Sequence, residues 1–266
     1  YDPVLALDRV YSTHACVVDG FTFDPGGLQL DADTLRGLDP LYEMVLHVGR
    51  QAFDEAATSQ LDRRRVGVTL AAIALRTDGS SAITREVLGR AFEHTLLGTT
   101  GIETQNAAAL SSPLNAHVTA RPASLLAQAL GLGGGSCTLD AACASSLCAV
   151  KLACDRLQDG SLDVAIAAAV NGADNLILHQ GFSALNALSK TGRSRPFAKG
   201  ADGLVPAEGA AAIVLKRLSD CSAKETVFGV IRGIGPYLLL KLAHFIHAMI
   251  HPIAVLQEMP GAFIHC

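Results

Sequence analysis

The sequence of 266 residues lacks the basic runs that mark a nucleic-acid-binding protein. The net charge is −4, from 21 basic and 25 acidic residues. The densest basic cluster, Arg63-Arg64-Arg65, directly precedes the strand-like run VGVTLAA. A cluster in that place is more typical of a solvated strand entry than of a phosphate site. We therefore expect no nucleic-acid partner.

Signals for secretion and for crossing a membrane are also missing. The segment Tyr1–Cys16 has no basic region followed by an apolar block, so no secretory signal is predicted. The apolar segment Tyr237–Gln257 is interrupted by Lys241, three histidines and Pro252, which excludes a membrane span. We expect a cytoplasmic protein without a membrane partner. Because the first residue is not Met, we also expect a fragment of a longer chain.

The cysteine pattern does not fit a disulfide framework or a zinc site. The number of cysteines is odd, no C-x-x-C occurs, and four cysteines fall within eighteen residues; they are at positions 16, 137, 143, 148, 154, 221 and 266. Reduced thiols fit better. His244, His247 and His251 share one face of a predicted helix, but no carboxylate or thiolate is well placed beside them. We expect no metal.

The composition is that of a globular protein with a large core, because half of the residues are hydrophobic and only 17% are charged. Apolar runs that resemble buried strands alternate with helical patterns, and this alternation predicts a mainly parallel or mixed sheet covered on both faces. Expected helices are Leu41–Ala57, Ala82–Leu96 and Arg121–Leu132; expected strands are Val66–Ala72, Ser136–Asp140, Val164–Val170 and Gly209–Leu218. The loop Leu188–Gly209 is long enough to suggest a function.

The stretch SCTLDAACASSLCAV, Ser136–Val150, places Cys143 where a strand meets a helix that is apolar almost all round. Unpaired N–H groups and the positive end of the helix dipole at such a position favour a thiolate and can stabilise an oxyanion. The small neighbours leave room for a substrate. Helix position alone leaves two readings open for Cys143, a nucleophile or a packed small side chain. Packing is the better reading for Cys137, Cys148 and Cys154.

The segment TLDAACASSL resembles the active site of β-ketoacyl synthases, in the branch that contains polyketide and polyunsaturated fatty acid synthases. The likeness continues on both sides, through LNAHVTARPASLLAQALGLGGG and GFSALNALSKTGRSRPFAKGADGLVPAEGAAAIVLKRL. It runs from about Val10 to Gly235. The resemblance implies the thiolase-like αβαβα fold, of which this chain carries essentially the N-terminal half. It predicts a synthase domain over residues 1–235 and an unrelated tail over 236–266.

The resemblance also implies an activity and its residues. Cys143 matches the nucleophile that takes an acyl group from an acyl carrier protein, before a decarboxylative condensation with a carrier-bound malonyl unit in fatty acid or polyketide biosynthesis. No metal or dissociable cofactor is implied, since the substrates ride on the carrier's phosphopantetheine. Glu208 matches a position that supports the site structurally. Ser136–Asp140 match the strand through which members of the family form homodimers.

The chain departs from the family in its histidines. The family uses one histidine of an H-G-T-G-T motif and one of a G-H motif to stabilise charge during decarboxylation and condensation. Neither motif occurs here. We therefore expect slow acyl acceptance at most, with little condensation. One alternative is an incomplete fragment that serves only as a dimerisation or interaction module. Another is a cysteine acyl-hydrolase, which needs His117 or His179 beside Cys143 as a base.

Overall fold

The computed structural model of the chain describes residues 9–56, 61–73, 77, 81–82, 89–98, 112–172, 176–223, 225–234 and 262–265. Among them, residues 9–22 and 171–209 form one compact unit, and residues 23–170, 210–234 and 262–265 form the other. Within these ranges no helix has the length and apolarity needed to cross a membrane. The segment Tyr237–Gln257 and the histidines at 244, 247 and 251 lie outside the described residues.

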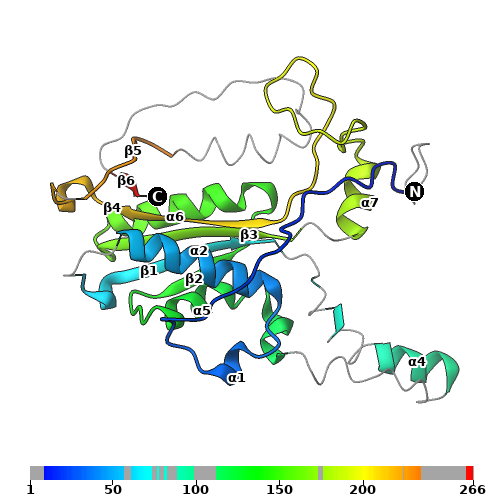
Figure 1. The fold of residues 1–266 in the computed structure, drawn as a ribbon, viewed down its shortest axis with the longest axis horizontal. Coiled ribbons are helices and arrows are strands. Elements are labelled where there is room, and N and C mark those ends of the chain that lie inside the picture. The colour runs from blue at the N-terminus through cyan, green and yellow to red at the C-terminus, as the bar shows by residue number, and fades with distance from the viewer. Residues whose placement is uncertain are drawn as a thin grey trace. The chain divides into compact units, whose positions relative to one another are not determined.

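The larger unit is built on a sheet, for which the described residues supply six strands in the order β2-β1-β3-β4-β6-β5 (Figure 1). The strands are β1 (Val66–Ala72), β2 (Ser136–Leu139), β3 (Val164–Asn171), β4 (Gly209–Lys216), β5 (Gly229–Ile231) and β6 (Ala262–His265). Strands β2 and β3 both pair with β1 in parallel, while β6 pairs antiparallel with β4 and β5. The sheet is therefore mixed, as the sequence predicts.

Strand β1 lies between two parallel neighbours, and all seven of its residues are buried. A continuous apolar run of this kind is typical of a strand covered on both faces. Two neighbouring rows of paired residues define these faces. Leu70 pairs with Thr138 of β2 and Ala168 of β3, whereas Thr69 pairs with Cys137 of β2 and Ala167 of β3. Because paired residues point to the same side, these two sets lie on opposite faces of the sheet.

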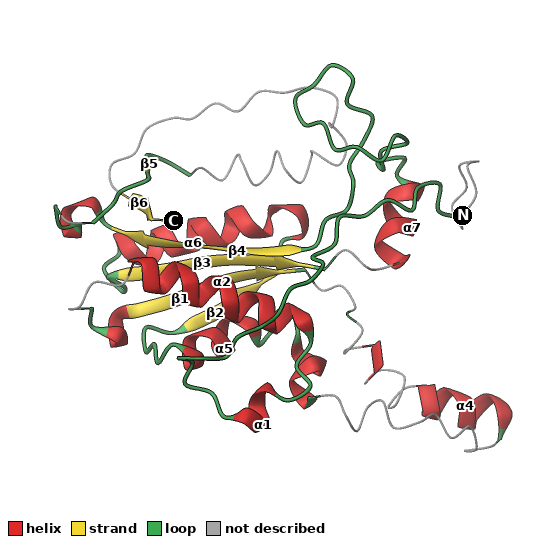
Figure 2. Ribbon diagram, viewed as in Figure 1, coloured by secondary structure: helices red, strands yellow, loops and turns green. Residues whose placement is uncertain are grey.

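Helices cover both faces (Figure 2). The described helices are α1 (Ala32–Leu35), α2 (Pro40–Ala56), α4 (Arg90–Leu97), α5 (Pro122–Ala129), α6 (Ser145–Gln158) and α7 (Leu176–Ala184). Helix α5 lies on the Thr138 face, where the Ala123 N–H donates to Thr138 Oγ1 at 3.2 Å. Helix α2 packs on α5: a Cβ on Gly49 would lie 2.5 Å from the Cδ atoms of Leu126, so a larger residue would require the buried Leu126 side chain to move.

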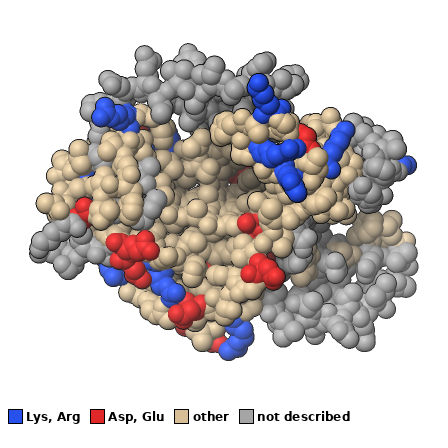
Figure 3. All heavy atoms as spheres, turned by 45° about the horizontal axis from the view of Figure 1, so that its top comes forward, with Lys and Arg blue, Asp and Glu red and all other residues tan. Residues whose placement is uncertain are grey.

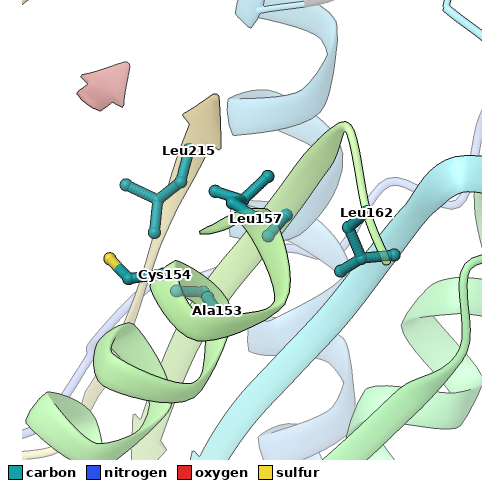
Figure 4. Packing of buried hydrophobic residues seen from close by; sticks show 7 residues of the cluster. Ala153, Cys154, Leu157, Leu162 and Leu215 are labelled. Atoms are coloured by element: carbon teal, nitrogen blue, oxygen red, sulfur yellow. The ribbon is translucent and has the colours of Figure 1, made fainter. Parts of the chain in front are cut away.

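Helix α6 covers the opposite face. Its Ala153, Cys154 and Leu157 form a buried cluster with residues of β3 and with Leu215 of β4 (Figure 4). The helix is not buried all round, however. Val150 is half-buried and Leu152 is 42% exposed. The pattern that is apolar almost all round therefore does not bury α6 on every side within the described residues, because the helix contacts the sheet along one side only.

An ion-pair cluster joins the starts of β1 and β3. The Arg65 guanidinium binds both carboxylate oxygens of Asp163, at 2.5 and 2.9 Å. Arg217, which follows β4, donates to Asp163 Oδ1 at 2.6 Å and to the carbonyls of Leu157 and Leu162. Hydrogen bonds from Arg65, then from Arg217, lower the pKa of Asp163 to about 2. This cluster fixes the amino-terminal edge of the parallel strands.

The smaller unit contains α7 and the loop Leu188–Gly209. Single bridges connect Cys16 to Ala207 and Leu188 to Leu204. Asp202 anchors the loop, accepting from Ser189 Oγ at 2.9 Å and from the backbone N–H of Thr191 at 3.0 Å. Desolvation raises the pKa of this carboxyl group, but these hydrogen bonds lower it further, so the net shift is downward. The predicted loop is therefore irregular but internally bonded.

Candidate functional site

Cys143 lies at the carboxyl end of the parallel strands. Strand β2 ends at Leu139, and the chain turns through Asp140 and Ala141 into the 3-10 turn η5 (Ala142–Ala144), which leads directly into α6. In open α/β sheets, ligands bind beyond this end of the strands, where loops leave the sheet. The Cys143 side chain is exposed. The thiol is therefore accessible at the edge where such folds place their chemistry.

The residue before the cysteine has a strained backbone. Ala142 adopts φ +49°, in the left-handed region that residues with a Cβ avoid. Its N–H donates to Asp140 Oδ1 at 2.8 Å, and its carbonyl accepts from Ser145 Oγ at 2.6 Å. Ser145 Oγ also accepts the Ala141 N–H at 2.8 Å. Non-glycine residues keep such conformations where several contacts impose them, and they cluster at functional sites.

The start of α6 adds a favourable electrostatic setting. The first N–H groups of a helix lack intrahelical acceptors and carry partial positive charge. The neighbours on either side, Ala142 and Ala144, carry only methyl groups. An acyl carbonyl can therefore approach the sulfur without displacing a large side chain. This combination of accessible thiol, helix start and small neighbours suits attack on a thioester.

The other cysteines nearby differ in exposure. Cys154 is 4% exposed, and desolvation raises the pKa of its thiol to about 11. Cys148 is half-buried. Cys137 is exposed, so the expectation that it packs in the core is wrong. The Cys137 side chain points to the face of the sheet on which α6 lies. Strand β2 is at the end of the strand order, however, and the described part of α6 does not cover Cys137 there.

The remaining predicted site residues belong to other elements of the chain. His117 is an exposed residue in the last turn of the 3-10 helix η4 (Pro113–His117). His179 lies in α7 of the smaller unit, where its Nε2 is 3.3 Å from the His14 carbonyl. Glu208 belongs to the same unit, and its N–H donates to the Cys16 carbonyl at 2.8 Å. No group of metal-ligating side chains occurs among the described residues.

Sequence reasoning missed the two side chains that shape the turn, Asp140 and Ser145. A signal was present, because Asp and Ser commonly bond backbone groups two or three residues away in turns and at helix starts. The pattern Asp-Ala-Ala-Cys-Ala-Ser places one such residue on each side of the cysteine. What the pattern does not reveal is that both side chains act on the same residue, Ala142.

Comparison with known proteins gives a consistent result. The family model described as "Beta-ketoacyl synthase, N-terminal domain" matches residues 2–221. The PKS-NRPS hybrid synthetase ATPKS of Aspergillus niger is 34% identical over 238 residues, which are 88% of this chain and 12% of that protein. A mycocerosic acid synthase-like polyketide synthase of Mycolicibacterium smegmatis is 44% identical over 109 residues, 41% of this chain and 5% of that protein.

Solved structures agree. The PfaC keto synthase-chain length factor is 36% identical with a TM-score of 0.66, and the match covers 80% of this chain and 24% of that one. The ketosynthase from module 6 of the bacillaene synthase of Bacillus subtilis is 26% identical with a TM-score of 0.60, covering 87% and 35%. This chain spans only about a tenth of the length of the first curated relatives.

Proposed function

The chain belongs to the β-ketoacyl synthase family, of whose thiolase-like fold it carries essentially the N-terminal half, and we propose that Cys143 is its acyl-accepting nucleophile. The observation that carries the proposal is the turn at the end of β2. It holds an accessible thiol at the start of α6 behind a strained residue whose N–H and carbonyl are both hydrogen-bonded.

The proposed step is a transthioesterification. The Cys143 thiolate attacks the carbonyl of an acyl thioester on an acyl carrier protein, and the oxyanion of the tetrahedral intermediate is stabilised by backbone N–H groups. The C–S bond to the carrier then breaks, and the carrier leaves as its phosphopantetheine thiolate. Charge and electrons balance within this exchange, and we expect no metal or dissociable cofactor to take part.

In the proposed second step, carrier-bound malonyl loses CO₂ and the resulting carbanion attacks the Cys143 thioester. The new carbon–carbon bond displaces the Cys143 thiolate and leaves a β-ketoacyl chain on the carrier. An enolate develops during this step and needs cationic or hydrogen-bonding partners. None of the nine histidines of this chain lies in a His-Gly-Thr segment. We therefore expect the second step to be slow in these 266 residues.

The charge of the loop in the smaller unit supports an anionic partner, which fits a carrier whose phosphopantetheine bears a phosphate. Four exposed cationic residues lie within ten positions of this loop, Lys190, Arg193, Arg195 and Lys199. Figure 3 shows the blue side chains gathered over this loop, which Figure 1 draws in yellow. Phe197, 97% exposed and at φ +66°, stands among them. A positive surface of this kind attracts an anionic partner and accelerates its encounter.

The assembly proposed is a homodimer through β2. This strand is at one end of the sheet, and its first two residues, Ser136 and Cys137, are exposed. An exposed edge strand can pair with the same strand of a second copy about a two-fold axis. The same feature favours the second candidate function, a chain that acts chiefly as a dimerisation module of a larger synthase.

Acyl loading tests the function directly. The chain is incubated with acyl-carrier thioester, then with malonyl-carrier thioester, and its intact mass is followed. We expect one acyl adduct on the wild type and on Cys137→Ala, none on Cys143→Ala, and little β-ketoacyl product. An adduct that persists in Cys143→Ala refutes the assignment of the nucleophile. Efficient elongation by this chain alone refutes the expected loss of the second step. Rapid release of free acid instead favours the hydrolase.

A further inference from the structure

Ser145 occupies an unusual place beside the candidate nucleophile. Its side chain is buried, at 4% exposure, although it is at the first position of α6. Its hydroxyl accepts the Ala141 N–H at 2.8 Å and donates to the Ala142 carbonyl at 2.6 Å. We propose that Ser145 is a positioning residue for acyl transfer, which orients the peptide group between Ala142 and Cys143. The inference rests on the proposed function of Cys143.

The argument starts from the planarity of the peptide bond. The carbonyl of Ala142 and the N–H of Cys143 belong to one rigid trans peptide group and point in opposite directions. A hydrogen bond that holds the carbonyl toward the buried Ser145 hydroxyl therefore turns the Cys143 N–H away from it. The N–H of a nucleophile is well placed to donate to the oxyanion that forms when its own side chain attacks a carbonyl.

The strained backbone of Ala142 explains why hydrogen bonds with Asp140 and Ser145 are needed to hold it. Asp140 Oδ1 accepts the N–H of Ala142, and the Ala142 carbonyl accepts from both Ser145 Oγ and the Ser145 backbone N–H. The two peptide groups that flank Ala142 are therefore both fixed, which imposes φ +49° on a residue that would otherwise relax to negative φ. Without the Ser145 hydroxyl, the Ala142 carbonyl keeps only the bond from the Ser145 backbone N–H, and the Ala141 N–H loses its acceptor. The Ala142–Cys143 peptide is then held less firmly, so both the amide and the thiol lose part of their fixed direction.

Two reactions of the same thiol separate positioning from a general structural role. Acyl transfer passes through an oxyanion and needs the oriented N–H. Alkylation by iodoacetamide displaces iodide without forming an oxyanion, so it depends on the thiolate and its accessibility. Loss of the hydrogen bond from the Ser145 hydroxyl to the Ala142 carbonyl should therefore slow acyl loading much more than alkylation. A merely structural effect, such as partial unfolding, should change both rates in the same proportion.

The experiment compares Ser145→Ala with Ser145→Thr, which retains the hydroxyl, and with Ser146→Ala, an exposed neighbour that serves as the matched control. Acyl loading is measured by intact mass, and Cys143 alkylation by peptide mapping across a pH series. We expect Ser145→Ala to load at least about tenfold more slowly, with alkylation slowed by no more than about threefold. Ser145→Thr should regain most of the loading rate, and Ser146→Ala should match the wild type in both.

Asp140→Ala provides a second variant in case Ser145→Ala does not fold, because Asp140 is exposed and acts on the other side of the strained residue. It should show the same preferential loss of loading. The proposal is overturned if folded Ser145→Ala accepts acyl groups as fast as the wild type. It is also overturned if the rates of acyl loading and alkylation fall by the same factor in this variant. If Ser145→Ala does not fold, the same two outcomes in folded Asp140→Ala overturn it. If the wild type accepts no acyl group, the proposed function fails and the positioning role fails with it. Unchanged loading in the variant of an active chain refutes the positioning role alone.

Discussion

Limited alkylation should label Cys143 before any other cysteine of the described chain. The buried thiol is the simplest comparison. With a pKa of about 11, Cys154 is ionised in about one molecule in a thousand at pH 8, and only 4% of the residue is exposed. Its labelling should therefore be about a thousandfold slower than that of an accessible thiolate, and it should remain unmodified until the protein unfolds.

The more demanding comparison is with Cys16 and Cys137, because these two residues are exposed, as Cys143 is. Accessibility alone predicts similar rates for the three. Only Cys143 is at the start of a helix, where a negative charge gains about 0.3–1 kcal/mol, equivalent to about a two- to fivefold rate advantage. The advantage should shrink in high salt, since the effect of the helix dipole is screened by ions.

The assay uses substoichiometric iodoacetamide at pH 8, followed by peptide mapping with a heavy-isotope counter-label. Cys137→Ser should leave Cys143 labelling unchanged, and Cys143→Ser should leave the slower sites as they are. Preferential modification of Cys137 or Cys16 in the native chain would refute the reasoning. It would mean that the turn after β2 does not activate the thiol, and that Cys143 is only a small residue at a helix start.

Two further predictions concern stability and assembly. The depressed pKa of Asp163 gives stability that is present above the unfolded-state value near 4 and is lost as pH falls toward about 2. The shift corresponds to at most about 2.5 kcal/mol, and screening at a side chain 41% exposed reduces it to about 1 kcal/mol. Asp163→Asn should therefore lower the urea-unfolding free energy by about 1 kcal/mol at pH 7 and by almost nothing below pH 2. The control Asp33→Asn, in an exposed ion pair, should change it little; equal losses would contradict the network. Sedimentation should show a dimer that Cys137→Lys weakens, and a compact wild-type monomer at micromolar concentration would exclude assembly through β2.

The periodic parts of the fold could be predicted from the sequence. Val66–Ala72 is a continuous apolar run, and it forms the buried strand β1 with the predicted bounds. The helix expected over Leu41–Ala57 is α2 at Pro40–Ala56. These predictions are confirmed because burial on both faces, or along one stripe, leaves a pattern in the order of residues. The helix expected over Ala82–Leu96 is described from Arg90 as α4, and residues 83–88 lie outside the described part.

Features that depend on a neighbour from another part of the chain were harder to predict. Cys137 looks apolar in sequence, yet its exposure depends on the position of β2 at the end of the strand order. Apolar residues occur on almost every side of α6, so the sequence does not show which side of the helix packs on the sheet. The positive φ of Ala142 has no signature in its own identity. The boundary near residue 235 stays a prediction; the family match ends at residue 221, and β6 at 262–265 pairs with β4 and β5.

The parallel arrangement of β1, β2 and β3 separates the ion-pair cluster from the candidate nucleophile by the length of a strand. At about 3.3 Å per residue, the seven residues of β1 span about 23 Å. Effects on stability from sites so far apart add almost independently. A chain of this architecture can therefore accumulate changes around Cys143 that cost stability, and offset them with substitutions around Asp163 that leave the turn untouched. The residues around Cys143 can then vary while the opposite end of the parallel strands maintains the fold.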